Sequence, residues 1–235
     1  MRKKQAVAAA LILSFITIGG GSLYAQWWQS DKDTKSAPFR FEWKSLSKSY
    51  WRAILISGVF GLANSSDTFL LLRAGPAKNG GVGLTAFLVV LAYAGYNLVF
   101  SFISYPLGKL SDRIGRWSTL FVGWVLYAFV YFAFGISNTV SIWFIFAVYG
   151  VSIGAVTAVN KALIADQAPK SAKGTAIGIF QLVTGVATLI ASPIMGWLWD
   201  RYGAPAAFDF CAGFALLAAL LIPLTAKMAA EPKAA

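Results

Sequence analysis

A short charged pattern occurs twice in this chain of 235 residues. Gly108–Gly115 and Gly196–Gly203 both read G-x-L-x-D-R-x-G, so each copy sets a carboxylate directly beside a guanidinium. Such groups can form ion pairs that break and re-form when helices tilt, but they are not a nucleophile with its base. His is absent from the sequence and Cys211 is its one cysteine. The sequence therefore predicts no enzyme, no metal site and no cofactor.

Five residues in and beside the first copy are predicted to act together as a charged latch that gates movement. Gly108 is small enough to let helices approach closely, and Asp112 favours the positive end of the next helix. Gly115 permits a turn that a residue with a β-carbon resists. The guanidinium groups of Arg113 and Arg116 can pair with Asp112, with a neighbouring acid or with lipid headgroups.

The elements that carry both copies are membrane helices by composition. The chain is 58% hydrophobic and 12% charged, whereas an average soluble chain is roughly 25% charged. Its apolar segments approach the ~20 residues that a helix needs to cross a bilayer, and they are too continuous for barrel strands. The six segments are Ile54–Leu72, Leu84–Leu107, Ser118–Ile136, Ile142–Ile164, Ala176–Trp199 and Ala206–Leu224.

Three of these segments lie between the two copies of the pattern, so the copies are expected on opposite sides of the membrane. This arrangement is typical of an inverted-topology repeat. The predicted fold class is all-α. It is a polytopic six-helix bundle made of two inverted three-helix repeats, with an extra N-terminal hydrophobic segment.

Lys and Arg residues set the expected orientation. One side of the six segments carries fourteen of them, and the other carries three, at Arg73, Lys78 and Arg201. Because cytoplasmic loops are enriched in basic residues, we expect a multi-pass protein of the inner (plasma) membrane. The first copy of the pattern and the C-terminus are then cytoplasmic. The net charge of +11 is assigned to loops and lipid headgroups, so no nucleic-acid partner is expected.

Four regions are predicted along the chain. Residues 1–25 have a basic start and an apolar run, which fits a signal peptide, a short membrane helix or the remnant of a longer preceding helix. Residues 26–50 are expected to be a cytoplasmic polar segment. Residues 51–226 are the expected six-helix unit, and 227–235 the cytoplasmic tail.

Four polar residues inside the apolar segments are candidates for a substrate or ion path, namely Asn64, Asp67, Asn97 and Gln181. Ionisable groups within a membrane are costly and indicate function by default, so Asp67 is the strongest of them. A structural hydrogen-bond cluster explains Asp67 equally well. Interhelical hydrogen bonds are the simpler explanation for Asn97, Asn160 and Gln181.

Other residues have expected structural roles. Pro106 is expected to bend or end its helix, and Asp209 to cap the start of the last one. Lys161 and Asp166 lie near the cytoplasmic end of the fourth segment, where a salt bridge or snorkelling is the expected explanation. Two ridges of small residues are typical of close helix packing: Gly150, Gly154 and Ala158 form one, and Gly174, Gly178 and Gly185 form the other.

The stretch Tyr105–Arg116 resembles the signature loop of the major facilitator superfamily, which follows the second helix of each six-helix half. Asn64–Ala74 and Tyr96–Val99 resemble the first two helices of the C-terminal half in bacterial members. Lys161–Asp166 and the second copy of the pattern resemble its later helices. The resemblance covers Trp51–Leu224, and it implies a secondary transporter of an unidentified small solute.

The resemblance also implies that this chain is one half of such a protein. Alternating access needs two bundles that move about a central site. The implied partners are the lipid bilayer, an unidentified small molecule, and either a second six-helix half or a second copy of the chain. The alternative is a non-transporting membrane scaffold or a truncated fragment of a transporter. Family members often carry an acid near the position of Thr157, and this chain departs from that pattern. Because a threonine carries no proton at ordinary pH, the departure argues against proton coupling through that helix.

Overall fold

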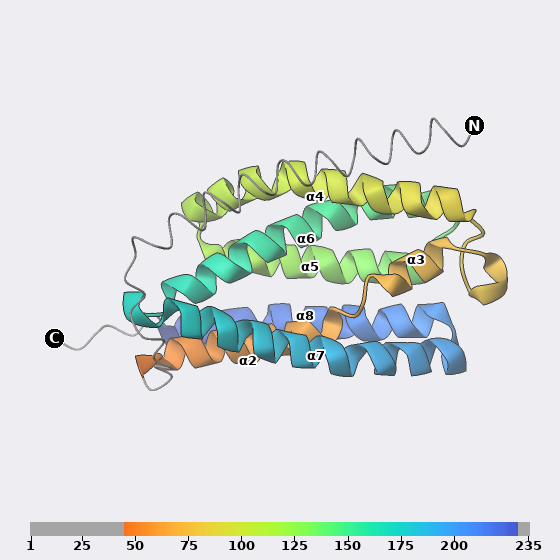
Figure 1. Ribbon diagram of the computed structural model, residues 1–235. Helices are drawn as coiled ribbons and strands as arrows, with labels where there is room; N and C mark the ends of the chain where they lie inside the picture. Colours follow the sequence, from red (N-terminus) through yellow and green to blue (C-terminus); the bar gives the residue numbers. More distant parts are fainter. Residues whose placement is uncertain (1–44, 230–235) are drawn as a thin grey trace, which may run out of the picture. The chain divides into compact units, whose positions relative to one another are not determined.

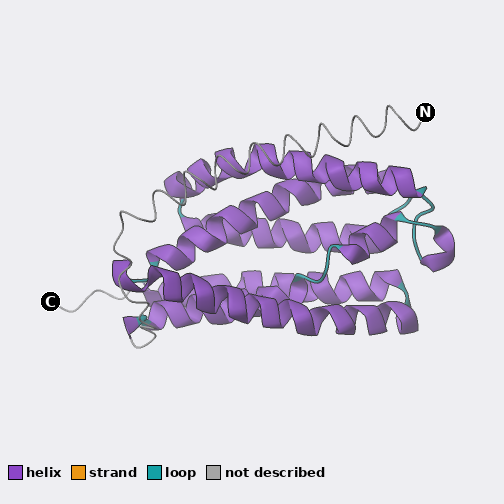
Figure 2. Ribbon diagram, in the orientation of Figure 1, coloured by secondary structure: helices purple, strands orange, loops and turns teal. Residues whose placement is uncertain are grey.

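The computed structural model describes residues 45–229, which belong to the second of two compact units of the chain, Glu42–Ala235. This part of the chain is built of helices and connecting loops (Figure 2). Short 3-10 turns, η2 (Ala77–Asn79) and η3 (Lys170–Ala172), lie in two of the connections. The α-helices in Figure 1 are α2 (Lys48–Ala63), α3 (Thr68–Ala74), α4 (Ala86–Ile114), α5 (Arg116–Gly135), α6 (Ser141–Asp166), α7 (Lys173–Tyr202) and α8 (Ala204–Ala229).

The six expected spans are confirmed. Six helical segments among the described residues are long and apolar enough to cross a membrane, and α2 and α3 together form the first. The helix end expected at Pro106 is wrong, because α4 continues through this residue to Ile114. With 29 residues α4 is roughly 43 Å long, which exceeds the ~30 Å hydrocarbon core. Most of the first charged pattern is therefore the end of a helix and not a loop.

Both copies of the repeated pattern end in the same backbone structure. Gly115 and Gly203 have φ angles of 94° and 86°, a region that favours glycine, and each is the single residue between two helices. Their amides donate to the carbonyl oxygens of Ser111 and Trp199, at 3.0 and 2.9 Å. The α4–α5 and α7–α8 turns lie at opposite ends of the helices (Figure 1), as an inverted repeat requires.

The helix packing is symmetric under exchange of the two repeats. α2 packs on α7 and α8, and its equivalent α6 packs on α4 and α5. The third helices of the repeats, α5 and α8, form the most extensive pair. The helices therefore form two groups: one contains α4, α5 and α6, and the other contains α2, α7 and α8 (Figure 1). The contact between α5 and α8 joins the two groups. Because each group mixes helices of both repeats, neither repeat is a separate folding unit.

Glycines mark where these helices approach most closely. A Cβ atom on Gly150 would lie 2.7 Å from the Tyr96 carbonyl oxygen, and one on Gly154 would lie 2.8 Å from Ile103 Cγ2. The small ridge of α6 is thus packed against α4, as predicted. The ridge of α7 differs, because no described atom lies within 4 Å of a Cβ built on Gly174, Gly178 or Gly185.

Gly150→Ala is expected to destabilise the helical unit by about 1–3 kcal/mol, the usual cost of overpacking, because the new methyl group meets backbone atoms of α4. Gly185→Ala is the matched control. Its methyl group enters open space, and Ala is favoured over Gly in a helix by up to ~1 kcal/mol. Thermal unfolding in mild detergent compares the two variants, and equal melting would contradict the packing described above.

The N-terminal predictions cannot be followed in this structure. Residues 1–25, the polar segment up to residue 44, and the tail from residue 230 lie outside the described residues. Within the described part, α2 begins at Lys48, where the Ser47 side chain accepts a hydrogen bond from the Tyr50 amide at 3.1 Å. This cap determines where the first span starts.

Candidate functional site

The first spanning segment is broken between α2 and α3 at Asn64–Asp67, so the continuous helix expected over Ile54–Leu72 is wrong. Short polar side chains compete with helical hydrogen bonds, and the Ser66 hydroxyl accepts one from the Thr68 amide at 3.3 Å. The Ser66 amide donates to Ser192 Oγ on α7, also at 3.3 Å. The break redirects the chain, so that α3 packs on α4 while α2 packs on α7 and α8.

Asp67 lies at the end of this break, but its side chain does not cap α3. Its two carboxylate oxygens accept hydrogen bonds from Tyr96 on α4, at 2.7 Å, and from Tyr149 on α6, at 3.0 Å. Arg73 is engaged elsewhere, since it donates to backbone carbonyls at the end of α5. Among the described residues Asp67 forms no ion pair. It is therefore an intramembrane carboxylate held by two phenols without a cation.

Tyrosines extend this site from Asp67 toward Asn64. Tyr127 on α5 donates to Asn64 Oδ1 at 3.1 Å, and its ring stacks on Tyr131 with 4.4 Å between centroids. The rings of Tyr131 and Tyr149 are 6.2 Å apart, which joins the two ends of the cluster. The buried Tyr131 hydroxyl has no hydrogen-bond partner within residues 45–229. Such a group costs about 1–3 kcal/mol when it is left unpaired.

A polar cavity of about 150 Å³ lies between α2, α6 and α7 and begins at Asn64. Lys161, an exposed residue, is the one cationic member of its lining. The buried Asn160 Oδ1 lacks a hydrogen-bond partner in the described part of the chain. The polar lining residues are Asn64, Thr157, Asn160, Lys161, Gln181 and Thr184. Amide, hydroxyl and ammonium groups together can bind a small molecule that carries hydroxyl groups and negative charge.

The structure brings only part of the predicted path together. Asn64 and Gln181 line the cavity, while Asp67 belongs to the tyrosine cluster beyond Asn64. Asn97 lines neither. Its amide nitrogen donates to the Tyr93 carbonyl oxygen of the same helix at 2.8 Å, in place of the expected interhelical bond.

Arg116 is the centre of the charged latch. Its Nε lies 3.0 Å from Asp166 Oδ2, at the end of α6, and its Nη2 lies 3.5 Å from Asp112 Oδ1, near the end of α4. Arg116 thus forms both kinds of ion pair expected of it, with Asp112 and with a neighbouring acid. The partner of Asp166 is Arg116 and not Lys161. One guanidinium therefore connects α4, α5 and α6.

Two other residues assigned to the latch, Arg113 and Gly108, do not have the contacts expected of them. Arg113 is exposed and forms no salt bridge with another described residue. A Cβ on Gly108 would meet no described atom within 4 Å, so the close helix approach expected there does not occur within this part of the chain.

Sequence patterns alone do not single out the tyrosines that hold Asp67 and Asn64. Tyrosine is enriched at membrane–water interfaces, where its hydroxyl reaches water. Tyr96, Tyr127 and Tyr149 instead lie well inside their helices. A tyrosine far from both ends of an apolar span needs a polar partner, and this position is the signal that could have found them.

Comparisons with known proteins find similarity to membrane transporters. An uncharacterized MFS-type transporter of Methanocaldococcus jannaschii is 34% identical over 198 residues, which cover 83% of this chain and 49% of that protein. The probable galactarate/D-glucarate transporter of Escherichia coli is 26% identical, over 74% of this chain and 40% of the relative. The hexuronate transporter of Bacillus subtilis is also 26% identical, over 65% of this chain and 36% of that relative. The chain spans about half the length, or less, of these curated relatives.

The family model matches a large continuous part of the chain. The model for the Major Facilitator Superfamily matches residues 61–235, which include the helix break, both copies of the repeated pattern and the polar cavity apart from Phe60. Together with the six spans and their inverted arrangement, this match establishes that the chain belongs to the Major Facilitator Superfamily.

Proposed function

We propose that this chain is one half of a secondary transporter and that its polar cavity binds a small hydroxylated carboxylate. The broken first span carries the proposal, because discontinuous helices form the substrate and ion sites of many transporters near the bilayer midplane. Here the break is held by phenols from three helices, and Asn64 at its start lines the cavity.

The substrate class rests on the charge and polarity of the cavity wall. Lys161 supplies the cation that a carboxylate needs, and the amides and hydroxyls beside it can bind hydroxyl groups. Two relatives are named for sugar acids, which are molecules of this kind. Asp67 has a different proposed role. A carboxylate without a cation among the described residues is suited to bind the coupling cation.

A second half is proposed to cover α4 and α7. These two helices hold equivalent places in the repeats and are the least buried of the six spans. Small residues on an open helix surface allow another helix to approach closely. The glycines of α4 and α7 at which an added Cβ meets no described atom within 4 Å are Gly95, Gly108, Gly174, Gly178 and Gly185.

Uptake into proteoliposomes tests both the substrate and the need for a partner. The chain alone is expected to show no uptake of labelled glucarate. Assembled with an N-terminal six-helix half it should take up glucarate, and glucuronate but not glucose should compete. Lys161→Gln is expected to raise KM roughly tenfold, the effect of one lost charge-assisted hydrogen bond, while Lys78→Gln in η2 leaves it unchanged.

Each part of the proposal can fail separately in that assay. Uptake by a monodisperse monomer would show that no second half is needed. Equal uptake of glucose and glucarate would overturn the substrate class. If the assembled pair takes up no solute at all, the chain is a membrane scaffold.

The proposed orientation places the α4–α5 turn in the cytoplasm and the α7–α8 turn outside. Arg113 and Arg201 are exposed and hold equivalent places in the two copies of the pattern. In a Cys211→Ala background, a membrane-impermeant maleimide is expected to label Arg201→Cys in intact cells. Arg113→Cys should react only after permeabilisation. The opposite labelling would reverse the orientation.

A further inference from the structure

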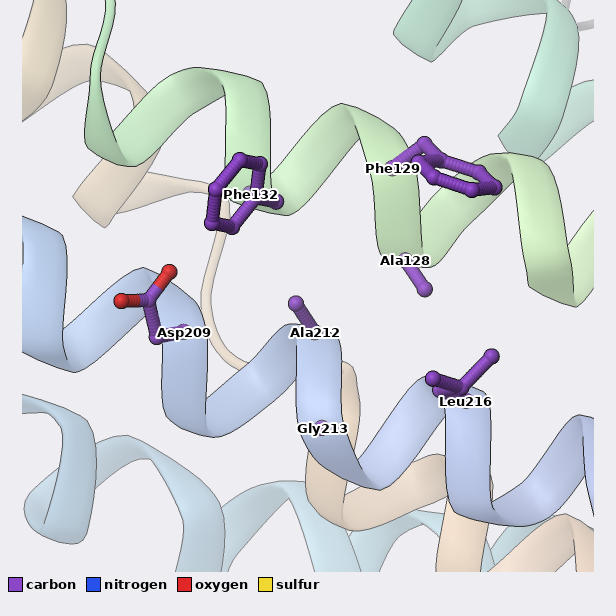
Figure 3. A pocket seen from close by; sticks show the side chains of 7 residues that line it. All are labelled: Ala128, Phe129, Phe132, Asp209, Ala212, Gly213 and Leu216. Atoms are coloured by element: carbon purple, nitrogen blue, oxygen red, sulfur yellow. The ribbon is translucent and has the colours of Figure 1, made fainter.

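An apolar groove follows the contact between α5 and α8, two helices that contribute no residue to the polar cavity. Its volume is about 470 Å³, within the roughly 300–1,000 Å³ of small-molecule sites. Side chains of both helices face the space between them (Figure 3). The lining residues are Ala128, Phe129 and Phe132 of α5, with Asp209, Ala212, Gly213 and Leu216 of α8.

Asp209 is the one polar residue of this lining. In Figure 3 its carboxylate points toward α5 near Phe132, at one end of the groove, and Leu216 lies at the other end. The capping role expected of Asp209 is wrong, because α8 begins at Ala204 and Asp209 lies in its second turn. The side chain is exposed, and it forms no ion pair within the described range.

Exposed apolar side chains of two spans line most of the groove, so it is expected to face hydrocarbon. Phe129 is 67% exposed and Leu216 is 43% exposed, on spans that are apolar enough to cross a membrane. Asp209 and Leu216 are seven residues apart, or roughly 10 Å along the helix axis. The groove therefore extends from the membrane interior toward the end where α8 starts. A carboxylate on the lipid-facing side of a span, close to its end, is favoured by a cationic partner.

We propose that this groove binds one phospholipid with a primary ammonium headgroup, of the phosphatidylethanolamine type. One acyl chain lies along the groove beside Gly213, and the ammonium donates a hydrogen bond to the Asp209 carboxylate. An acyl chain gains little by leaving other acyl chains, so selectivity comes from the charged pair. A choline headgroup has no N–H group to donate, and an anionic headgroup repels the carboxylate.

The carboxylate also argues against a second copy of the chain as the occupant. A two-fold dimer uses the same surface on both subunits, so a dimer through this groove brings the two Asp209 groups toward one another. Two like charges in a medium of low dielectric constant repel strongly. The ammonium group of the lipid neutralises the same carboxylate that a second copy of Asp209 would repel.

Native mass spectrometry of the full chain tests this site. The protein is purified in mild detergent and mixed with equal amounts of phosphatidylethanolamine, phosphatidylcholine and phosphatidylglycerol, and the retained lipid is identified. Phosphatidylethanolamine is expected to be retained preferentially. Asp209→Asn should lower its retention roughly tenfold, because a neutral amide oxygen replaces the charged acceptor of the ammonium hydrogen bond. Asp200→Asn, an exposed acid of α7 outside the groove, is the control.

A second variant tests the acyl chain independently of the charge. A Cβ on Gly213 meets no atom of another described element within 4 Å, so Gly213→Leu is expected to place its side chain in the groove and should also reduce lipid retention. Gly185→Leu, equally open on α7, should not. Unchanged melting shows that each variant is folded. Equal retention of the three lipids, a phosphatidylethanolamine preference that survives Asp209→Asn, or a dimer lost in Gly213→Leu would overturn the proposal.

Discussion

Asp67→Asn is expected to reduce the accumulation of solute by roughly a hundredfold, the upper range of coupling between two sites, while exchange of solute across the membrane continues. The amide keeps the shape of the carboxylate but carries no charge, so it cannot neutralise a coupling cation. Uphill uptake and solute counterflow, measured in the same proteoliposomes of the assembled transporter, separate coupling from binding.

The phenols that hold Asp67 provide the matched controls. Tyr96→Phe and Tyr149→Phe each remove one hydrogen-bond donor and leave the carboxylate in place. Each is expected to lower the free energy of unfolding by about 1–2 kcal/mol, because Asp67 is only partly buried. Accumulation of solute should remain measurable in both variants. If Asp67→Asn loses exchange, accumulation and membrane abundance together, Asp67 is part of a structural hydrogen-bond cluster instead.

Arg116→Glu is expected to reduce turnover at least roughly tenfold with little change in melting temperature, because exposed ion pairs contribute only about 0–1 kcal/mol to stability. The substitution breaks the contact with Asp166, which links α5 to α6, and places two acids side by side. Adding Asp166→Arg restores the pair in reverse and should recover much of the turnover. Initial rates of uptake by the single and double variants measure this.

Substitutions of two neighbouring charged residues, Asp112 and Arg113, show whether the effect of Arg116→Glu comes from the ion pair. Asp112→Asn should be milder than Arg116→Glu, since its distance to Arg116 is the longer one, 3.5 Å, and Arg116 keeps Asp166. Arg113→Glu makes the same change of charge at an exposed position outside these ion pairs and should leave turnover near that of the parent protein. Equal losses in Arg113→Glu and Arg116→Glu would make net charge the cause and not the ion pair.

The membrane class, the number of spans and the inverted repeat are determined by the sequence alone. Backbone N–H and C=O groups in hydrocarbon need hydrogen-bond partners within the protein, and a long apolar segment provides them by forming a helix. The repeated pattern marks equivalent places in the two repeats, and Gly115 and Gly203 have the backbone angles that a single-residue turn requires. The ends of α4 and α7 were harder to predict, because helices continue beyond the bilayer once water replaces lipid.

The candidate site was decided by tertiary structure. Asp67 and Tyr149 are 82 residues apart in the sequence, and Arg116 meets Asp166 only because α5 and α6 lie together. In a membrane bundle the side facing lipid is as apolar as the side facing other helices, so the hydrophobic pattern reveals that a helix spans but not how it is rotated. Which polar side chains meet is therefore set by helix packing and by the break at Asn64–Asp67.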